Sequence, residues 1–171
     1  MIEYIVEDGT GKVDSTSYVD ITYIDQYAEN VGYSDWSGYS LPVKQSYSNQ
    51  ATQYIDLSFN FSGIKTDSSQ SLEFPRTDCY ESCIKEYFDN NEIPAKLKKA
   101  VCEIAINRGL NDSRLIASTG EVFKKEKVGS LEVERFTAGT TQKTYPQVNK
   151  ILSCFSKYNL FDVIDLERAW V

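Results

Sequence analysis

The sequence contains no histidine, and this absence narrows the chemistry open to the chain. Histidine is the commonest general base and a member of the usual nucleophilic triad, so both catalytic arrangements are missing. Zinc is disfavoured too, because Cys79 and Cys83 have no second pair of ligands at a metal-site spacing. We therefore expect a protein that is not an enzyme and has no metal and no cofactor. A cysteine-dependent enzyme using Cys79 or Cys83 remains as a hypothesis, but no partner base is evident.

Long apolar runs are also missing. No stretch approaches the ~20 residues that a membrane-spanning helix requires. The N-terminal Met-Ile-Glu-Tyr lacks the basic start and the apolar stretch of a signal peptide. These features predict synthesis in the cytoplasm and no membrane partner. All four cysteines (Cys79, Cys83, Cys102 and Cys154) are then expected to be reduced.

Positive charge is scarce in the first part of the chain. Residues 1–95 contain 5 Lys and Arg against 16 Asp and Glu, a net charge of −11, whereas residues 96–171 contain 13 against 9, a net charge of +4. Most of the 12 tyrosines lie in the acidic part. A protein that binds single strands without sequence preference combines a basic groove with aromatic platforms. The separation of these residue types along the sequence counts against that function.

Hydrophobic periodicity predicts a small bundle of about four helices. Helix caps, proline at first turns and closing glycines place them at about 21–31, 42–57, 93–108 and 146–155. A short strand over residues 2–6 is expected before them. The following Gly9-Thr10-Gly11 lacks the lysine and the helix of a phosphate-binding loop, which favours a turn.

Three connecting segments have distinct patterns. Trp36 lies in a Gly, Ser and Tyr-rich loop and is either a hydrophobic plug on the core, which we favour, or an interface anchor. The segment Gln70–Arg76 alternates, so Leu72 and Phe74 share one side and form a strap on the helices. Residues 77–92 are expected to form a loop with one turn of helix.

A β-hairpin is predicted at 122–136, with Gly129-Ser130 as a two-residue turn. This register pairs Phe123 with Phe136, Lys125 with Glu134, Lys127 with Glu132 and Val128 with Leu131. Val128, Leu131 and Val133 then share an apolar face. A two-stranded hairpin is marginal alone, so this face must cover either the helices or a neighbouring subunit.

Two further features have alternative interpretations. Lys96, Lys98 and Lys99 form either a nucleic-acid patch or, more commonly, a solvated helix face. Residues 157–171 are apolar for a chain end, which suggests a docking arm; packing on the chain's own domain is the alternative. The apolar residues of this arm are Leu160, Phe161, Val163, Ile164, Leu166 and Trp170.

Four motifs occur in a recognisable order: Val6-Glu7-Asp8-Gly9-Thr10-Gly11, Ser17-Tyr18-Val19, Gln70-Ser71-Leu72-Glu73-Phe74-Pro75-Arg76 and Glu126-Lys127-Val128-Gly129-Ser130-Leu131-Glu132-Val133. The order resembles a family of tailed-phage head-to-tail connectors, or adaptors, that are often labelled DnaT-like single-stranded DNA-binding proteins. The resemblance covers the chain from the first strand to roughly Leu152. It implies a mainly α fold, α+β by content, with about four helices, a short N-terminal strand and one protruding hairpin. The expected domains are a connector-like helical domain at 1–156 and the docking arm at 157–171.

The resemblance implies a structural virion protein that forms a ring between portal and tail, at the neck of the virion. Its expected partners are the portal protein, tail or neck proteins, further copies in a dodecameric ring, and double-stranded DNA passing through without sequence recognition. The arm residues become portal-binding candidates. Arg76, Val128, Leu131 and Val133 become inter-subunit candidates. The alternative is a DnaT-like single-stranded DNA-binding replication protein.

Overall fold

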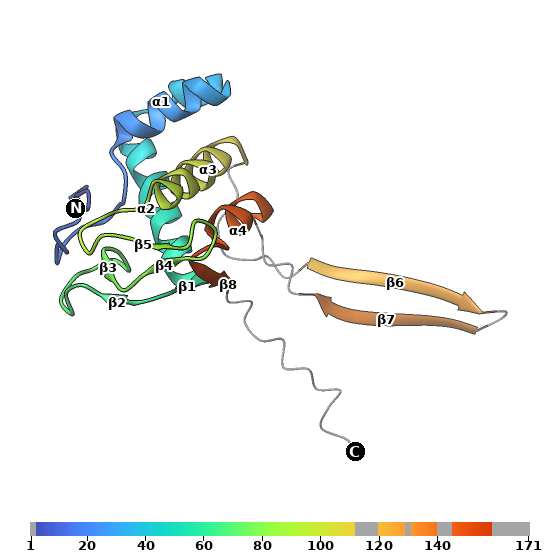
Figure 1. Cartoon of the computed structure of the whole chain (residues 1–171). Helices are drawn as coiled ribbons and strands as arrows, with labels where there is room; N and C mark the ends of the chain where they lie inside the picture. The colour runs from blue at the N-terminus through green and yellow to red at the C-terminus, as the bar shows by residue number, and fades with distance from the viewer. Residues whose placement is uncertain (1–2, 112–119, 129–130, 140–144, 159–171) are drawn as a thin grey trace, which may run out of the picture. The chain divides into compact units, whose positions relative to one another are not determined.

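The computed structural model of the chain, drawn in Figure 1, describes residues 3–111, 120–128, 131–139 and 145–158. The chain divides into two compact units. The helical unit comprises residues 1–112 and 145–171, and the hairpin unit comprises residues 113–144. The hairpin unit is therefore an insertion between two helices of the other unit.

The described residues of the helical unit form four α-helices, which confirms the predicted mainly α class. They are α1 (Ile21–Val31), α2 (Leu41–Ser58), α3 (Ala95–Asn111) and α4 (Pro146–Leu152), and a short 3-10 helix, η1 (Ser34–Gly38), follows α1. Helix α3 packs against α1, α2, η1 and α4. Its buried face carries Leu97, Ala100 and Val101, all with no exposed surface. Small side chains on this face let neighbouring helices approach closely.

The bounds of α1 follow from its two capping residues. The Asp20 carboxylate accepts a hydrogen bond from the Thr22 backbone N–H at 2.8 Å, which satisfies a donor that has no partner inside the helix. At the other end Gly32 has φ of +81°, a left-handed conformation that glycine adopts without strain. Both ends agree with the sequence prediction.

Trp36 confirms the predicted hydrophobic plug. Its side chain is 2% exposed, and its ring N–H donates to Asp25 Oδ1 at 2.7 Å. The Lys44 ammonium lies 5.5 Å from the ring centroid and 2.9 Å from the same Asp25 oxygen. The indole N–H and the ring face thus both find partners, which lets a large polar aromatic group be buried.

Short antiparallel strand pairs complete the helical unit. They join β1 (Phe59–Phe61) to β8 (Ser156–Tyr158), β2 (Ile64–Lys65) to β3 (Arg76–Thr77), and β4 (Tyr80–Glu81) to β5 (Glu86–Tyr87). The β1–β8 pair includes two residues of the expected docking arm, Lys157 and Tyr158. In place of the predicted N-terminal strand, the described residues form only an isolated parallel bridge between Val6 and Ser17.

The prediction of a helical turn within residues 77–92 is wrong, because this segment is the β4–β5 hairpin. Lys85 adopts φ of +61°, and its backbone N–H donates to the Glu81 carbonyl at 2.8 Å. This contact closes the chain between the two strands. In this segment Tyr80, Ile84 and Tyr87 are exposed, whereas Cys79 is buried.

The hairpin unit contains β6 (Gly120–Val128) and β7 (Leu131–Gly139). Their register pairs Val128 with Leu131 and Phe123 with Phe136, which confirms the predicted pairing. The turn residues 129–130 lie outside the described residues. The strands extend beyond the predicted 122–136, out to Gly120 and Gly139.

Phe74 lies at the centre of an aromatic cluster in the helical unit. It is fully buried, and its ring centroid is 5.0 Å from that of Phe61 and 6.1 Å from that of Phe155. Tyr18 packs edge-on at 6.4 Å. The cluster joins the strap to β1 and to the segment after α4.

None of the helices among the described residues is long and apolar enough to span a membrane.

Candidate functional site

The glycine-rich N-terminal loop wraps a carboxylate of its own chain. Glu7 is 2% exposed, and its Oε1 accepts hydrogen bonds from the backbone N–H groups of Gly9 and Gly11, each at 2.9 Å. Its Oε2 accepts from the Lys12 N–H at 2.8 Å and from the Ser15 hydroxyl at 3.1 Å. The amides that could have bound a phosphate are therefore occupied by Glu7. The loop is a structural turn, as predicted.

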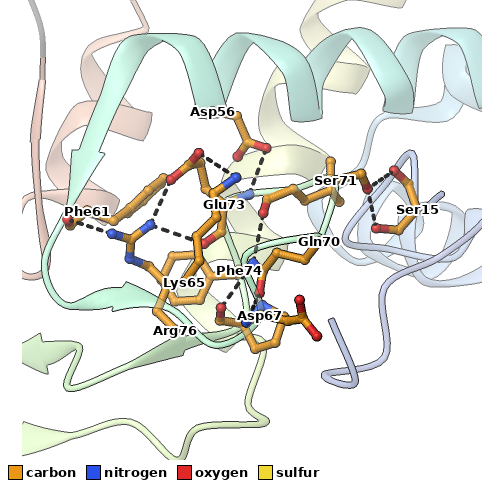
Figure 2. Close-up of polar contacts among 12 residues, drawn as sticks. Ser15, Asp56, Phe61, Lys65, Asp67, Gln70, Ser71, Glu73, Phe74 and Arg76 are labelled. Atoms are coloured by element: carbon orange, nitrogen blue, oxygen red, sulfur yellow. Dashed lines mark hydrogen bonds and ion pairs between the residues drawn. The ribbon is translucent and has the colours of Figure 1, made fainter. Parts of the chain in front are cut away.

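The strap, defined as residues 70–76, is fixed by a buried glutamine. Gln70 is 4% exposed, and its Nε2 donates to the carbonyl oxygens of Leu72 at 2.8 Å and Pro75 at 3.1 Å. Its Oε1 accepts from the Asp67 N–H at 3.0 Å. Ser71 joins the strap to the N-terminal loop by donating from its hydroxyl to the Ser15 carbonyl at 2.6 Å. Figure 2 shows these contacts converging beneath α2.

Arg76 uses its donors inside the chain. Its Nη1 donates to Glu73 Oε2 at 2.7 Å, its Nε to the Ser62 carbonyl at 2.9 Å and its Nη2 to the Gly63 carbonyl at 2.7 Å. Lys65 lies 3.1 Å from the other Glu73 oxygen (Figure 2). Arg76 is 8% exposed, so this inter-subunit candidate lies within a network that joins β3 to the β1–β2 connection. Its partner carboxylate is one of its own chain.

Asp56 joins α2 to the strap. Its Oδ1 accepts from the Tyr18 hydroxyl at 2.6 Å. Its Oδ2 accepts from the Glu73 N–H at 3.2 Å (Figure 2). Burial raises the pKa of Asp56 to about 7, and the two hydrogen bonds oppose this shift. Burial also raises the pKa of Tyr18 well above its usual value. The pair positions the strap on the helix, and its stability depends on the charge of Asp56.

A disulfide connects Cys83, in the β4–β5 turn, to Cys154, which follows α4, across 71 residues of sequence. The prediction that all four cysteines are reduced is therefore wrong for this pair. The fold brings the two segments together, as shown by the Ser82 N–H and hydroxyl donating to the Cys154 carbonyl at 2.8 and 2.7 Å. Cys79 and Cys102 are buried thiols, and burial raises the pKa of Cys102 to about 12. A raised pKa disfavours the reactive thiolate.

A groove of about 360 Å³ adjoins this disulfide. We call it the serine groove; its lining residues are Asn60, Phe61, Ser62, Tyr80, Ser82, Ser153, Cys154, Phe155 and Ser156. Beside it, Tyr80 and Tyr87 stand opposite each other in the β4–β5 register, with ring centroids 5.0 Å apart. Tyr80 is 37% and Tyr87 68% exposed. The groove thus combines hydroxyl groups with an exposed aromatic pair.

The α3 lysines do not act as a group. Lys96 forms an ion pair with the buried carboxylate of Glu81, whereas Lys98 is half-buried and Lys99 is exposed. Within the described residues, no three His, Cys, Asp or Glu side chains come close enough to hold a metal ion. The portal-binding candidates from Leu160 to Trp170 all lie outside the described residues.

The hairpin unit places like charges opposite each other at one position. The register pairs Lys124 with Arg135, directly beside the Phe123–Phe136 pair. The inter-subunit candidates Val128 and Leu131 pair at the end of the ladder, and Val133 pairs with Glu126. Like charges directly opposite in a hairpin are destabilising. The Lys124–Arg135 pair was missed in the sequence analysis, although it follows from the same register.

A model of the protein family described as "Putative DnaT-like ssDNA binding protein" matches residues 2–168 of the chain. No curated protein and no solved structure matches it. The family match overturns the prediction of a head-to-tail connector, because the family it identifies is described by single-strand binding. The expectations of portal and tail partners, a dodecameric ring and passage of double-stranded DNA are corrected with it. All four motifs behind that prediction lie inside the matched range, and they fit the alternative instead.

Proposed function

The chain belongs to the family of DnaT-like single-stranded DNA-binding proteins, and from this we propose that it binds single-stranded DNA without a requirement for base sequence. The observation that carries the proposal is the family match over residues 2–168. Binding needs no catalytic group, which accords with a chain that has no histidine. The proposal is thus a binding protein rather than an enzyme.

The charge of the hairpin unit supports this proposal. Residues 113–144 contain 6 Lys and Arg against 4 Asp and Glu, in a chain whose overall net charge is −7. The register places the basic residues Lys124 and Arg135 opposite each other. Basic residues that neutralise phosphate groups release the counterions of the DNA, which favours binding. The neighbouring position of the ladder pairs Phe123 with Phe136. Unpaired bases stack on aromatic residues regardless of sequence.

A titration of a fluorescein-labelled single strand, followed by anisotropy, tests the proposal. The strand should exceed the ~4–16 nucleotides that a small binding domain covers. We expect binding that weakens as salt is raised from about 50 to about 200 mM. Absence of binding by the wild-type protein in the low-salt buffer would overturn the proposal.

Charge variants of the hairpin unit measure its contribution to DNA binding. Replacing Lys124 and Arg135 by glutamine should lower the affinity and reduce the salt slope by about 0.7 for each phosphate that the protein no longer neutralises. The matched control replaces Glu126 and Glu132 by glutamine on the same ladder, which should leave the affinity unchanged or raise it. Equal affinity for both double variants would mean that the hairpin charges do not contact DNA.

A further inference from the structure

The serine groove lies where two distant parts of the sequence meet. One wall comes from β1 and β4, in the acidic part of the chain, and the other from residues 153–156, in the basic part. The antiparallel β1–β8 pair and the Cys83–Cys154 disulfide hold the two walls together. Its volume of about 360 Å³ falls at the low end of the ~300–1,000 Å³ typical of small-molecule sites. The groove is large enough for one planar ring system.

The aromatic pair at its edge is unusual for this molecule. Tyr18, Tyr54 and Trp36 are all buried in the core, whereas Tyr80 and Tyr87 are the tyrosines that stand exposed among the residues whose exposure is described. Their rings are tilted by 57° and hold each other in place across β4 and β5. Exposed aromatic rings on a short hairpin provide a face on which a nucleobase stacks.

Lysines flank both walls of the groove in the sequence. Lys85 is exposed in the β4–β5 turn, two residues after Cys83, and Lys150 is exposed on α4, four residues before Cys154. Glu81, on the same hairpin as Lys85, is already paired with Lys96, which leaves Glu86 as the exposed carboxylate of these strands. Asp78 and Asp89 are exposed as well, two residues outside these strands, so the β4–β5 hairpin offers a stacking surface rather than an excess of positive charge.

We infer that the serine groove holds an unpaired base of single-stranded DNA, stacked on the Tyr80–Tyr87 pair. The inference rests on the proposed single-strand binding and assigns a base-contacting site to it. The serine hydroxyls of the groove donate their protons to backbone carbonyls, and their oxygens can still accept a hydrogen bond from the amino group of a base.

Replacing both tyrosines tests the stacking contact. The Tyr80→Ala/Tyr87→Ala double variant should bind the labelled single strand about tenfold more weakly or worse, because it has no ring on which a base can stack. The Tyr80→Phe/Tyr87→Phe variant keeps both rings and should retain near wild-type affinity. Leu57→Ala, at an apolar site that is 79% exposed and on α2, is the control and should leave binding unchanged.

Photo-crosslinking provides a measurement on the unaltered protein. A single strand containing iododeoxyuridine should crosslink to Tyr80 or Tyr87, as located by mass spectrometry of the digested complex. Wild-type binding with crosslinks elsewhere, or full affinity in a folded alanine variant, would overturn the groove site and leave the proposed function standing. Absence of wild-type binding would overturn both.

Discussion

The strap and the β4–β5 hairpin are both short non-helical segments of the helical unit, but the strap buries its main side chains whereas the hairpin exposes them. In the strap, Gln70 and Phe74 are at most 4% exposed, and the polar groups bond within the chain. In the hairpin, Tyr80, Ile84 and Tyr87 are 37%, 56% and 68% exposed. The strap therefore stabilises the unit, whereas the hairpin presents a surface. Variants of the two segments should separate stability from DNA binding.

The largest effect on stability is expected at the centre of the strap. Phe74→Ala removes a fully buried ring that packs on Phe61 and Phe155, so the free energy of unfolding should fall by about 3–5 kcal/mol. Urea denaturation followed by circular dichroism measures this loss. The matched aromatic variant Tyr87→Ala, on the exposed hairpin, should change stability by no more than about 0.5 kcal/mol. Similar losses of unfolding free energy in Phe74→Ala and Tyr87→Ala would contradict the distinction between a stabilising strap and an exposed hairpin.

The disulfide should contribute the next largest effect, because it joins the hairpin to the segment after α4. Cys83→Ser opens a covalent loop of 71 residues and should cost about 2–4 kcal/mol of unfolding free energy. A reducing agent should bring the wild-type protein to the stability of the variant and leave the variant itself unaffected. If reductant changes neither protein, the two cysteines are not linked in solution.

Asp56 should make stability depend on pH. Its pKa in the folded state, about 7, lies above the usual value of 3.8, because the carboxyl is buried. Between these pH values the folded state holds more protons than the unfolded state, so the free energy of unfolding falls as pH rises through this window. The free energy of unfolding changes by about 1.4 kcal/mol for each unit by which the pKa of Asp56 differs between the folded and unfolded states. In Asp56→Asn this component should vanish, and parallel pH profiles of melting temperature for both proteins would contradict the assignment.

The smallest effect is expected at the exposed end of the same network. Lys65 and Arg76 both pair with Glu73, but the Lys65 side chain is 33% exposed and that of Arg76 10%. Lys65→Gln should therefore cost less than about 1 kcal/mol, as is usual for partly solvated ion pairs. Arg76→Gln leaves several buried carbonyl groups without their donor and should cost clearly more. Equal losses of stability in Lys65→Gln and Arg76→Gln, measured by thermal unfolding, would contradict the expected difference between the exposed and the buried ion pair.

Local signals predicted much of this fold from the sequence. Asp20 and Gly32 fix the ends of α1 because capping depends on neighbouring residues alone. The β6–β7 register followed from the two-residue turn and the charge pattern. The β4–β5 hairpin was missed because a two-residue strand carries almost no alternation, and its conformation depends on the turn at Lys85 and on distant contacts.

The candidate site was harder to predict, since it depends on contacts between distant segments. Cys83 and Cys154 are separated by 71 residues, and no spacing rule pairs them. Tyr80 and Tyr87 of the β4–β5 hairpin lie in the acidic part of the chain, residues 1–95, whereas Lys150 lies in the basic part, residues 96–171. This separation along the sequence argued against single-strand binding. The connector prediction rested on motif order, and these same motifs lie inside the matched single-strand-binding family.

A competition titration tests the central claim, that the protein prefers single-stranded DNA, most directly. The wild-type protein, bound to a labelled single strand in low salt, is challenged with unlabelled single strand or with duplex of the same sequence. We expect the single strand to displace the label at a much lower concentration than the duplex, because only unpaired bases expose the faces that stack on tyrosine or phenylalanine. Equal displacement by the duplex, or no complex with the single strand at all, would contradict the account.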